Sequence, residues 1–132
     1  ALIAVDDVPA RLHGLVALAM KQEAEIVVVS DAELNELPEV VEVQPLHALE
    51  EVCKWADYIA MDIDRENLSQ LKKMFGKQEQ AAAVQEAQIL VRVAMPCGGV
   101  ADCGVCAVIP SVRHDWKMAC KHGPVFVYHD IK

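Results

Sequence analysis

Four cysteines lie close together in the last third of the chain and have the spacing of a metal-binding loop. They are Cys97, Cys103, Cys106 and Cys120, which give the pattern C-x5-C-x2-C-x13-C. Thiolates are soft ligands that suit iron–sulfur clusters, zinc and copper(I). A plant-type [2Fe–2S] loop reads C-x4-C-x2-C followed by a distant cysteine, so its first gap is one residue shorter. We therefore predict that these four residues are the ligands of a metal centre.

The spacing leaves three interpretations of these cysteines open, and an iron–sulfur cluster agrees with it best. A zinc ribbon usually carries two C-x2-C pairs, whereas only Cys103 and Cys106 form such a pair here. Disulfides are disfavoured because the chain has five cysteines, an odd number, and shows no secretory signal at its start. Gly98, Gly99 and Gly104 would let the loop wrap closely around inorganic sulfides. Structural zinc, and disulfides or inert thiols, stay as the alternatives.

Three other residues could in principle join such a centre. His114 and His122 lie near the cysteine run, and histidine replaces cysteine in Rieske-type clusters and binds zinc. Because four cysteines already suffice, we do not expect either histidine to be a ligand. Cys53 lies beside Val52 on the apolar face of a predicted helix, and we expect it to be a core residue.

Composition and charge point to one globular domain with a small appendage. The chain has 132 residues, of which 54% are hydrophobic, and no apolar run approaches the ~18 residues of a membrane span. Residues 1–94 carry 8 basic and 17 acidic residues, whereas residues 95–132 carry 4 and 3. This shift predicts a domain boundary at residue 95, and the absence of a basic stripe excludes nucleic acid as an expected partner. Free thiols without a signal peptide predict the reducing cytoplasm.

Hydrophobic patterning ahead of the cysteines predicts strands that alternate with helices. Such alternation is typical of an α/β fold with a parallel, Rossmann-like sheet, here of about five strands. The predicted strands cover 1–5, 26–29, 40–43, 58–63 and 88–93, and the predicted helices cover 10–21, 46–55, 65–75 and 77–86. Beyond the cysteine loop, we expect residues 107–110 and 125–128 to pair as a small hairpin.

Two segments of the chain resemble a known family. Residues 95–106 and 117–126, in which Gly-Pro-Val-Phe closely follows Cys120, resemble the C-terminal iron–sulfur module of the dihydroorotate dehydrogenase B electron-transfer subunit. The resemblance is specific over residues 95–126 and only architectural over residues 1–94. It implies a [2Fe–2S] cluster on the four cysteines of residues 95–132, and a nucleotide-binding domain of the ferredoxin–NADP reductase type over residues 1–94.

The chain departs from this family where the family binds its nucleotide. The glycine-rich turn that cradles NAD phosphates is here Asp6-Asp7-Val8-Pro9, and a later Gly-Pro element is replaced by Asp62-Ile63-Asp64. Carboxylates repel a pyrophosphate, so dinucleotide binding should be weakened or lost. A divalent cation is another interpretation of these aspartates, although solvated loop carboxylates are favoured. The flavin-binding barrel that precedes this region in the family is absent, which places any FAD on a partner or on a region not included.

Taken together, the residues predict a degenerate ferredoxin–NADP reductase-like domain followed by a cluster-binding module. The expected function is an electron-transfer subunit or domain that relays electrons through the cluster to or from a flavin on a partner oxidoreductase subunit. The expected assembly is a hetero-oligomer or a homodimer, without nucleic acid or membrane. The alternative is a non-catalytic assembly or regulatory module with structural zinc on the same four cysteines. No Ser–His–Asp order, P-loop or paired-carboxylate pattern predicts catalytic residues.

Overall fold

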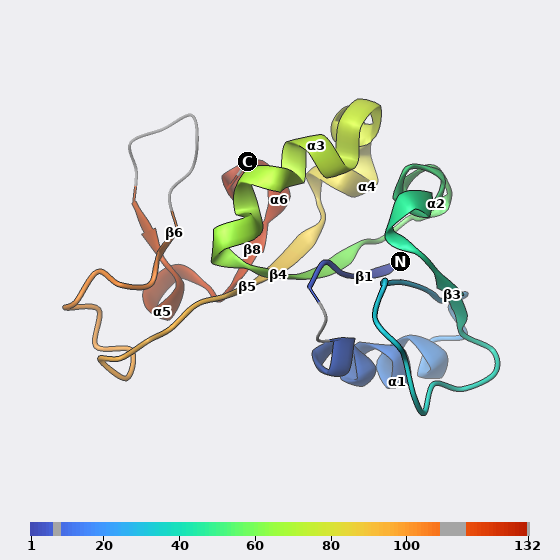
Figure 1. The fold of residues 1–132 in the computed structure, drawn as a ribbon, viewed down its shortest axis with the longest axis horizontal. Coiled ribbons are helices and arrows are strands. Elements are labelled where there is room, and N and C mark those ends of the chain that lie inside the picture. Colours follow the sequence, from blue (N-terminus) through green and yellow to red (C-terminus); the bar gives the residue numbers. More distant parts are fainter. Residues whose placement is uncertain (7–8, 109–115, 132) are drawn as a thin grey trace.

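The computed structural model describes residues 1–6, 9–108 and 116–131 and shows a mixed α/β fold (Figure 1). A six-stranded sheet has the strand order β3-β2-β1-β4-β5-β8, and β6 and β7 form a separate two-stranded sheet. The strands are β1 Leu2–Ala4, β2 Val27–Val29, β3 Glu42–Gln44, β4 Ala60–Asp64, β5 Gln88–Arg92, β6 Ala107–Val108, β7 Lys117–Met118 and β8 Val125–Val127. The α-helices are α1 His13–Lys21, α2 Leu49–Trp55, α3 Leu71–Phe75, α4 Ala82–Gln85, α5 Ala119–His122 and α6 Tyr128–Ile131. Four 3-10 segments cover Pro9–Leu12, Leu46–Ala48, Arg65–Gln70 and Gly76–Gln80.

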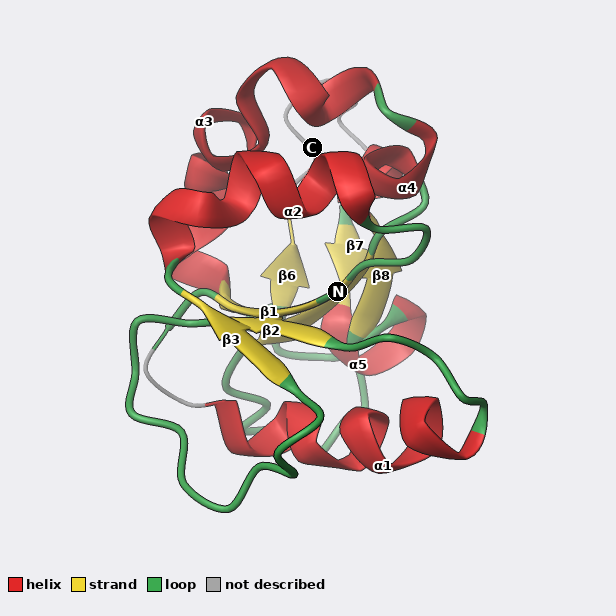
Figure 2. Cartoon of the chain, turned by 90° about the vertical axis from the view of Figure 1, so that its right-hand side faces the viewer, coloured by secondary structure: helices red, strands yellow, loops and turns green. Residues whose placement is uncertain are grey.

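The first five strands of the large sheet run parallel, which confirms the predicted α/β class with a mostly parallel sheet. Side chains alternate between two layers, as they must along a strand. On β2, Val27 and Val29 pack into the larger core with α2 and α3, while Val28 packs with Val16 of α1. Figure 2 shows the same layering, with α1 on one side of the sheet and α2 and α3 on the other. A continuous run of valines suits β2 because both of its faces are buried.

The strand order reverses at one point, which is where parallel α/β sheets commonly bind their ligands. From β1 the chain adds β2 and β3 on one side, and then returns to add β4 and β5 on the other. In open sheets of this kind, ligands bind outside the carboxyl ends of the strands at the point where the order reverses. Here that point lies between β1 and β4, which pair in parallel from Leu2↔Ala60 to Ala4↔Asp62.

The predicted hairpin between residues 107–110 and 125–128 is wrong. Residues 107–108 pair instead with Lys117–Met118, and β8 joins the large sheet antiparallel to β5, with Ile89 opposite Phe126. Residues 109–110 lie outside the described part of the chain. The reason is hydrophobic burial, because Phe126 is 4% exposed and contributes to the larger core. Its ring lies against Gly123, where an added Cβ would come within 2.5 Å of two ring carbons. This strand also covers the outer edge of β5.

The helices give one further observation. Over the described ranges 1–6, 9–108 and 116–131, none of them combines the length and the apolar character that crossing a bilayer requires.

Candidate metal centre

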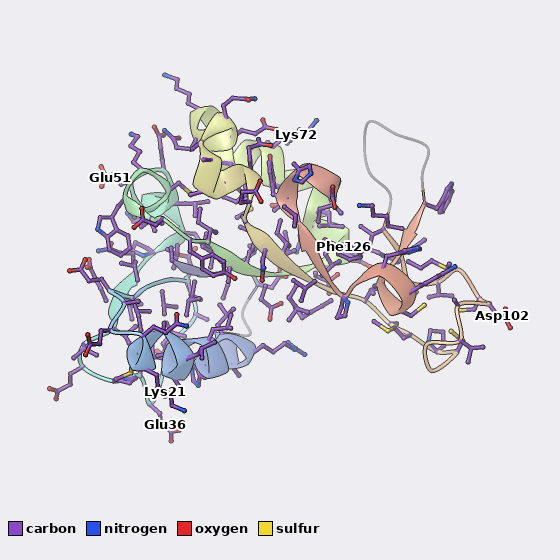
Figure 3. The ribbon with its side chains drawn as sticks, turned by 180° about the vertical axis from the view of Figure 1, so that it is seen from behind. Lys21, Glu36, Glu51, Lys72, Asp102 and Phe126 are labelled. Atoms are coloured by element: carbon purple, nitrogen blue, oxygen red, sulfur yellow. The ribbon has the colours of Figure 1, made fainter. Side chains whose placement is uncertain are left out.

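The four predicted ligands come from three segments of the chain. Cys97 and Cys103 lie on the loop that follows β5, Cys106 directly precedes β6, and Cys120 lies in α5 directly after β7. Figure 3 shows sulfur atoms gathered around the loop that carries Asp102. All four thiols are free. The sheet positions this site, because β5 leads into the loop and β8 returns the chain to the sheet after α5.

Cys106 and Cys120 form one contacting pair. Their Sγ atoms are 3.2 Å apart. The backbone holds them there, because Ala107 pairs with Met118 and the Ala119 N–H donates to the Cys106 carbonyl oxygen at 3.0 Å. A hydrogen bond from the Cys120 N–H, and then one from the Cys120 thiol, lower the pKa of Cys106. The thiolate form of Cys106 is therefore favoured.

Cys97 and Cys103 form the second pair. A hydrogen bond from the Cys103 thiol, followed by backbone N–H bonds from Gly99 and Ala101, lowers the pKa of Cys97 to about 6. The backbone turns these N–H groups toward the sulfur because Gly99 and Ala101 have φ values of 93° and 66°. Successive N–H groups in such a turn form a concave site for an anion. The loop thus stabilises a thiolate at Cys97.

The two pairs lie next to each other. The pKa of Cys120 is raised, first by its hydrogen bond to Cys106, then by burial, and also by the negative charges of Cys106 and Cys97. A Cβ placed on Gly99 would lie 3.9 Å from the Cβ of Cys120. Within the described residues, no three Cys, His, Asp or Glu side chains stand close enough together to hold a metal ion as they are. Ligation by all four thiols would therefore require the two pairs to move closer together.

The chemistry of the donor set, rather than its present spacing, suits a thiolate-ligated group. The two cysteine pairs are neighbours, and backbone N–H groups already favour the charged form at Cys97 and Cys106. Metal ligation requires that deprotonated form. Cys106 is 1% exposed, and Val108 and Ala119 beside it are fully buried, so the inner side of the site is apolar.

The remaining candidate ligands are placed elsewhere or engaged. His122 is exposed, and its Nδ1 accepts a hydrogen bond from the Met118 N–H at 3.0 Å. His114 lies outside the described residues. Cys53 is 2% exposed in the core on α2, as predicted, and burial raises the pKa of its thiol to about 11. Cys53 is therefore an inert packing residue.

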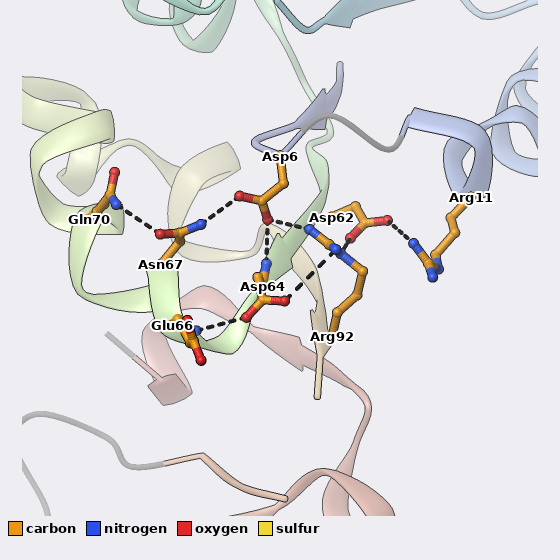
Figure 4. Close-up of polar contacts among 8 residues, drawn as sticks. All are labelled: Asp6, Arg11, Asp62, Asp64, Glu66, Asn67, Gln70 and Arg92. Atoms are coloured by element: carbon orange, nitrogen blue, oxygen red, sulfur yellow. Dashed lines mark hydrogen bonds and ion pairs between the residues drawn. The ribbon is translucent and has the colours of Figure 1, made fainter. Parts of the chain in front are cut away.

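The aspartates at the carboxyl ends of β1 and β4 form an ion-pair network with two arginines (Figure 4). Asp62 is 1% exposed, and its Oδ1 accepts from Arg92 Nε at 2.6 Å, while Arg11 lies 3.8 Å from its Oδ2. Asp6 pairs with the same Arg92 guanidinium and accepts the Asp64 N–H at 2.6 Å. Asp62 and Asp6 are thus not solvated loop carboxylates, which corrects that expectation. Asp7 lies outside the described residues.

Sequence reasoning missed the cationic half of this network. Arg92 is the last residue of β5, and it lies opposite Asp64 in the β4–β5 register. Asn67 adds a hydrogen bond from its Nδ2 to Asp6 Oδ1 at 2.5 Å. The available signal was an arginine at the carboxyl end of the strand that follows the Asp-rich one. With these contacts, the network occupies the position at which a dinucleotide-binding sheet would present its phosphate turn.

No family model, curated protein or solved structure matches this chain. The geometry of the cysteines and of the Asp6–Arg92–Asp62 network is therefore the basis for a functional proposal.

The low pKa of Cys97 makes a prediction for the chain without a bound metal. Iodoacetamide is expected to alkylate Cys97 readily at pH 7, because the thiolate is the nucleophile and a pKa of about 6 leaves it mostly ionised. The rate should fall as the pH drops through this value, by about tenfold between pH 7 and pH 5. Fragment mass spectrometry of the labelled peptide measures it, and buried Cys53 is the control that stays unlabelled. A Cys97 profile with its midpoint near that of an ordinary thiol, about pH 8.5, would contradict the geometry.

Proposed function

We propose that this chain is the electron-transfer component of a larger oxidoreductase, and that a [2Fe–2S] cluster on Cys97, Cys103, Cys106 and Cys120 carries the electrons. The observation that supports it is the proximity of two cysteine pairs, with backbone N–H groups directed at one thiol of each pair. The resemblance of residues 95–126 to the iron–sulfur module of dihydroorotate dehydrogenase B electron-transfer subunits supports the same group.

In this proposal the cluster supplies one-electron chemistry, and the chain supplies position and environment. The β6–β7 pairing holds Cys106 and Cys120, while the loop after β5 presents Cys97 and Cys103. Hydrogen bonds to the sulfurs and the exclusion of water are two of the levers that set the potential of such a cluster. The N–H groups of Gly99 and Ala101 act through the first lever.

The electron partner in this proposal is a flavin on another subunit. The cysteine loop itself carries exposed apolar side chains, with Val100 at 70% and Val105 at 43% exposure. A partner that covers them would bring its flavin close to the cluster, and apolar contact would stabilise that complex. The resemblance to an electron-transfer subunit supports such a flavoprotein partner in a hetero-oligomer. If the chain sediments as a free monomer when a native cell extract is fractionated, the proposal of a flavoprotein partner is contradicted.

The proposal further holds that the chain has lost dinucleotide binding. Asp6 and Asp62 place carboxylates at the carboxyl ends of β1 and β4, where they already neutralise Arg92. Calorimetric titration with NADH is therefore expected to give no heat of binding at millimolar nucleotide, because a pyrophosphate would have to displace these ion pairs. Saturable binding that Arg92→Ala abolishes would show instead that the arginine serves the nucleotide.

Redox titration tests the relay itself. One electron equivalent of dithionite per cluster is expected to bleach the visible bands of the anaerobic protein, and ferricyanide should restore them. A coloured protein that does not respond would contradict electron transfer. A colourless protein with stoichiometric zinc would favour the structural alternative, in which the four thiolates form a closed tetrahedral site.

A further inference from the structure

Cys106 and Cys120 are held together by the backbone, independently of any metal. The residues beside them, Ala107 and Met118, are paired across the β6–β7 ladder. The Ala119 N–H donates to the Cys106 carbonyl oxygen at 3.0 Å, which continues the ladder to the pair itself. The two sulfur atoms, 3.2 Å apart, would need to approach by only roughly 1.2 Å to reach the length of a disulfide bond.

The second pair lacks such a frame. Cys97 and Cys103 both belong to the loop between β5 and β6, and Cys103 is exposed. Within the described residues, the backbone hydrogen bonds around Cys97 are local ones. The Gly98 N–H donates to the Met95 carbonyl oxygen, and the Val100 N–H donates to the Cys97 carbonyl oxygen. Bringing two thiols together on a loop costs ordering entropy that a paired hairpin has already lost.

From this difference we propose that Cys106 and Cys120 form a redox-active disulfide pair in the chain without a metal centre, closed by a low-molecular-weight disulfide of the glutathione class. Its closure precedes that of Cys97 with Cys103, because the β6–β7 pairing already fixes the backbone of Cys106 and Cys120, whereas Cys97 and Cys103 lie on a loop without such pairing. The site is thus a thiol modification site with a defined pairing.

The exposure of the two thiols assigns their roles. Cys106 is 1% exposed, whereas Cys120 is half-buried and can be reached from solvent. Cys120, the thiol that solvent reaches, gives up its proton and attacks one sulfur of oxidised glutathione, which forms a mixed disulfide and releases one glutathione. Cys106 then attacks the Cys120 sulfur and expels the second glutathione. The two cysteines lose two electrons to glutathione, and their two protons end on the two released thiols.

Closure has a consequence that rests on the proposed function. Cys106 and Cys120 are two of the four proposed ligands, and a disulfide sulfur cannot act as a thiolate. A chain with this bond therefore accepts no cluster until a dithiol reduces it. The pair would make cluster assembly depend on the thiol–disulfide balance around the protein.

The sequence allows a direct test by peptide mapping. Trypsin cuts after Arg92, Arg113, Lys117 and Lys121, so Cys120 is the one cysteine of peptide 118–121, while the other three proposed ligands share peptide 93–113. The metal-free chain is equilibrated anaerobically in buffers of rising oxidised-to-reduced glutathione ratio, quenched with iodoacetamide and digested. We expect the two peptides to become linked while Cys97 and Cys103 are still alkylated. The glutathione ratio at which this happens should be at least about tenfold lower than the ratio at which a disulfide forms between Cys97 and Cys103.

Two variants identify the sulfurs. Cys106→Ser should abolish the link between the two peptides. Cys97→Ser should leave unchanged the oxidised-to-reduced glutathione ratio at which half of the chain is linked. Cys120 that stays alkylated or only glutathionylated across the series, or an equally stable link in Cys106→Ser, would overturn the proposal. Because peptide mapping needs no metal, its result tests the disulfide proposal independently of the cluster proposal. Iron and sulfide uptake by the dithiol-reduced chain tests the proposed function, and uptake by the closed chain tests the block.

Discussion

Replacing Cys103 by serine is expected to lower the bound iron of the anaerobically purified chain at least about tenfold and to remove its visible colour. A serine hydroxyl is not a thiolate, and iron–sulfur clusters depend on soft sulfur ligands. Cys103 is the exposed member of the four, so its replacement disturbs packing least. Iron analysis together with a urea unfolding curve on the same preparation separates lost ligation from lost folding.

Cys53→Ser is the matched control for this experiment. Cys53 is buried on α2 with Val52 and Leu49, away from the cysteine loop. Burying a hydroxyl there is expected to cost about 1–3 kcal/mol of stability, while the iron content of the folded protein stays that of the parent. Equal iron in Cys103→Ser and in the parent would overturn the ligand assignment.

Removing the Arg92 side chain is expected to have the largest effect on stability. Arg92→Ala leaves Asp62 buried at 1% exposure without the guanidinium that donates to it at 2.6 Å. Breaking a buried ion pair from one side typically costs 3–5 kcal/mol, and we expect about 3 kcal/mol here because Arg11 stays within reach of Asp62. The free energy of unfolding at pH 7, from urea titration, measures this loss.

Two further variants sharpen the Arg92 result. Lys54→Ala removes an exposed pair with Glu50, 3.2 Å apart on α2, and should change stability by less than about 0.5 kcal/mol. The double replacement Asp62→Leu with Arg92→Met removes the fully buried carboxylate together with its partner. It should recover most of the loss, because Asp6 is partly exposed and keeps its hydrogen bonds from the Asp64 N–H and Asn67. If the single variant Arg92→Ala is as stable as Lys54→Ala, the ion-pair network around Asp62 does not contribute to the stability of the fold.

The parallel sheet could be predicted because its strands carry their signal locally. The valine run of β2 and the alternation of strands with helices need no knowledge of distant partners. The position of β8 could not be predicted in this way. Its three residues pair with β5, more than thirty positions earlier, and what decides between that partner and β6 is the burial of Phe126 in the larger core. Such long-range burial is not visible in a local pattern.

The candidate site was predictable to a similar degree. Cysteine spacing named the four residues, and the structure brings them together as two pairs. Which thiols pair depends on the β6–β7 ladder and on the positive φ of Gly99 and Ala101, and neither follows from the spacing. The network of Asp6, Asp62 and Arg92 was half predicted. The aspartates stand at the carboxyl ends of β1 and β4 in the sequence, but Arg92 comes beside them only through the register of β4 with β5.

The metal content of the anaerobically purified chain tests the central claim most directly. The measurement is iron, acid-labile sulfide and zinc per chain, taken with the absorption spectrum of the same sample. We expect iron and sulfide in equal amounts with broad bands between roughly 400 and 600 nm, as ferric–thiolate clusters show. A colourless protein that holds one zinc on the same four cysteines would contradict the account.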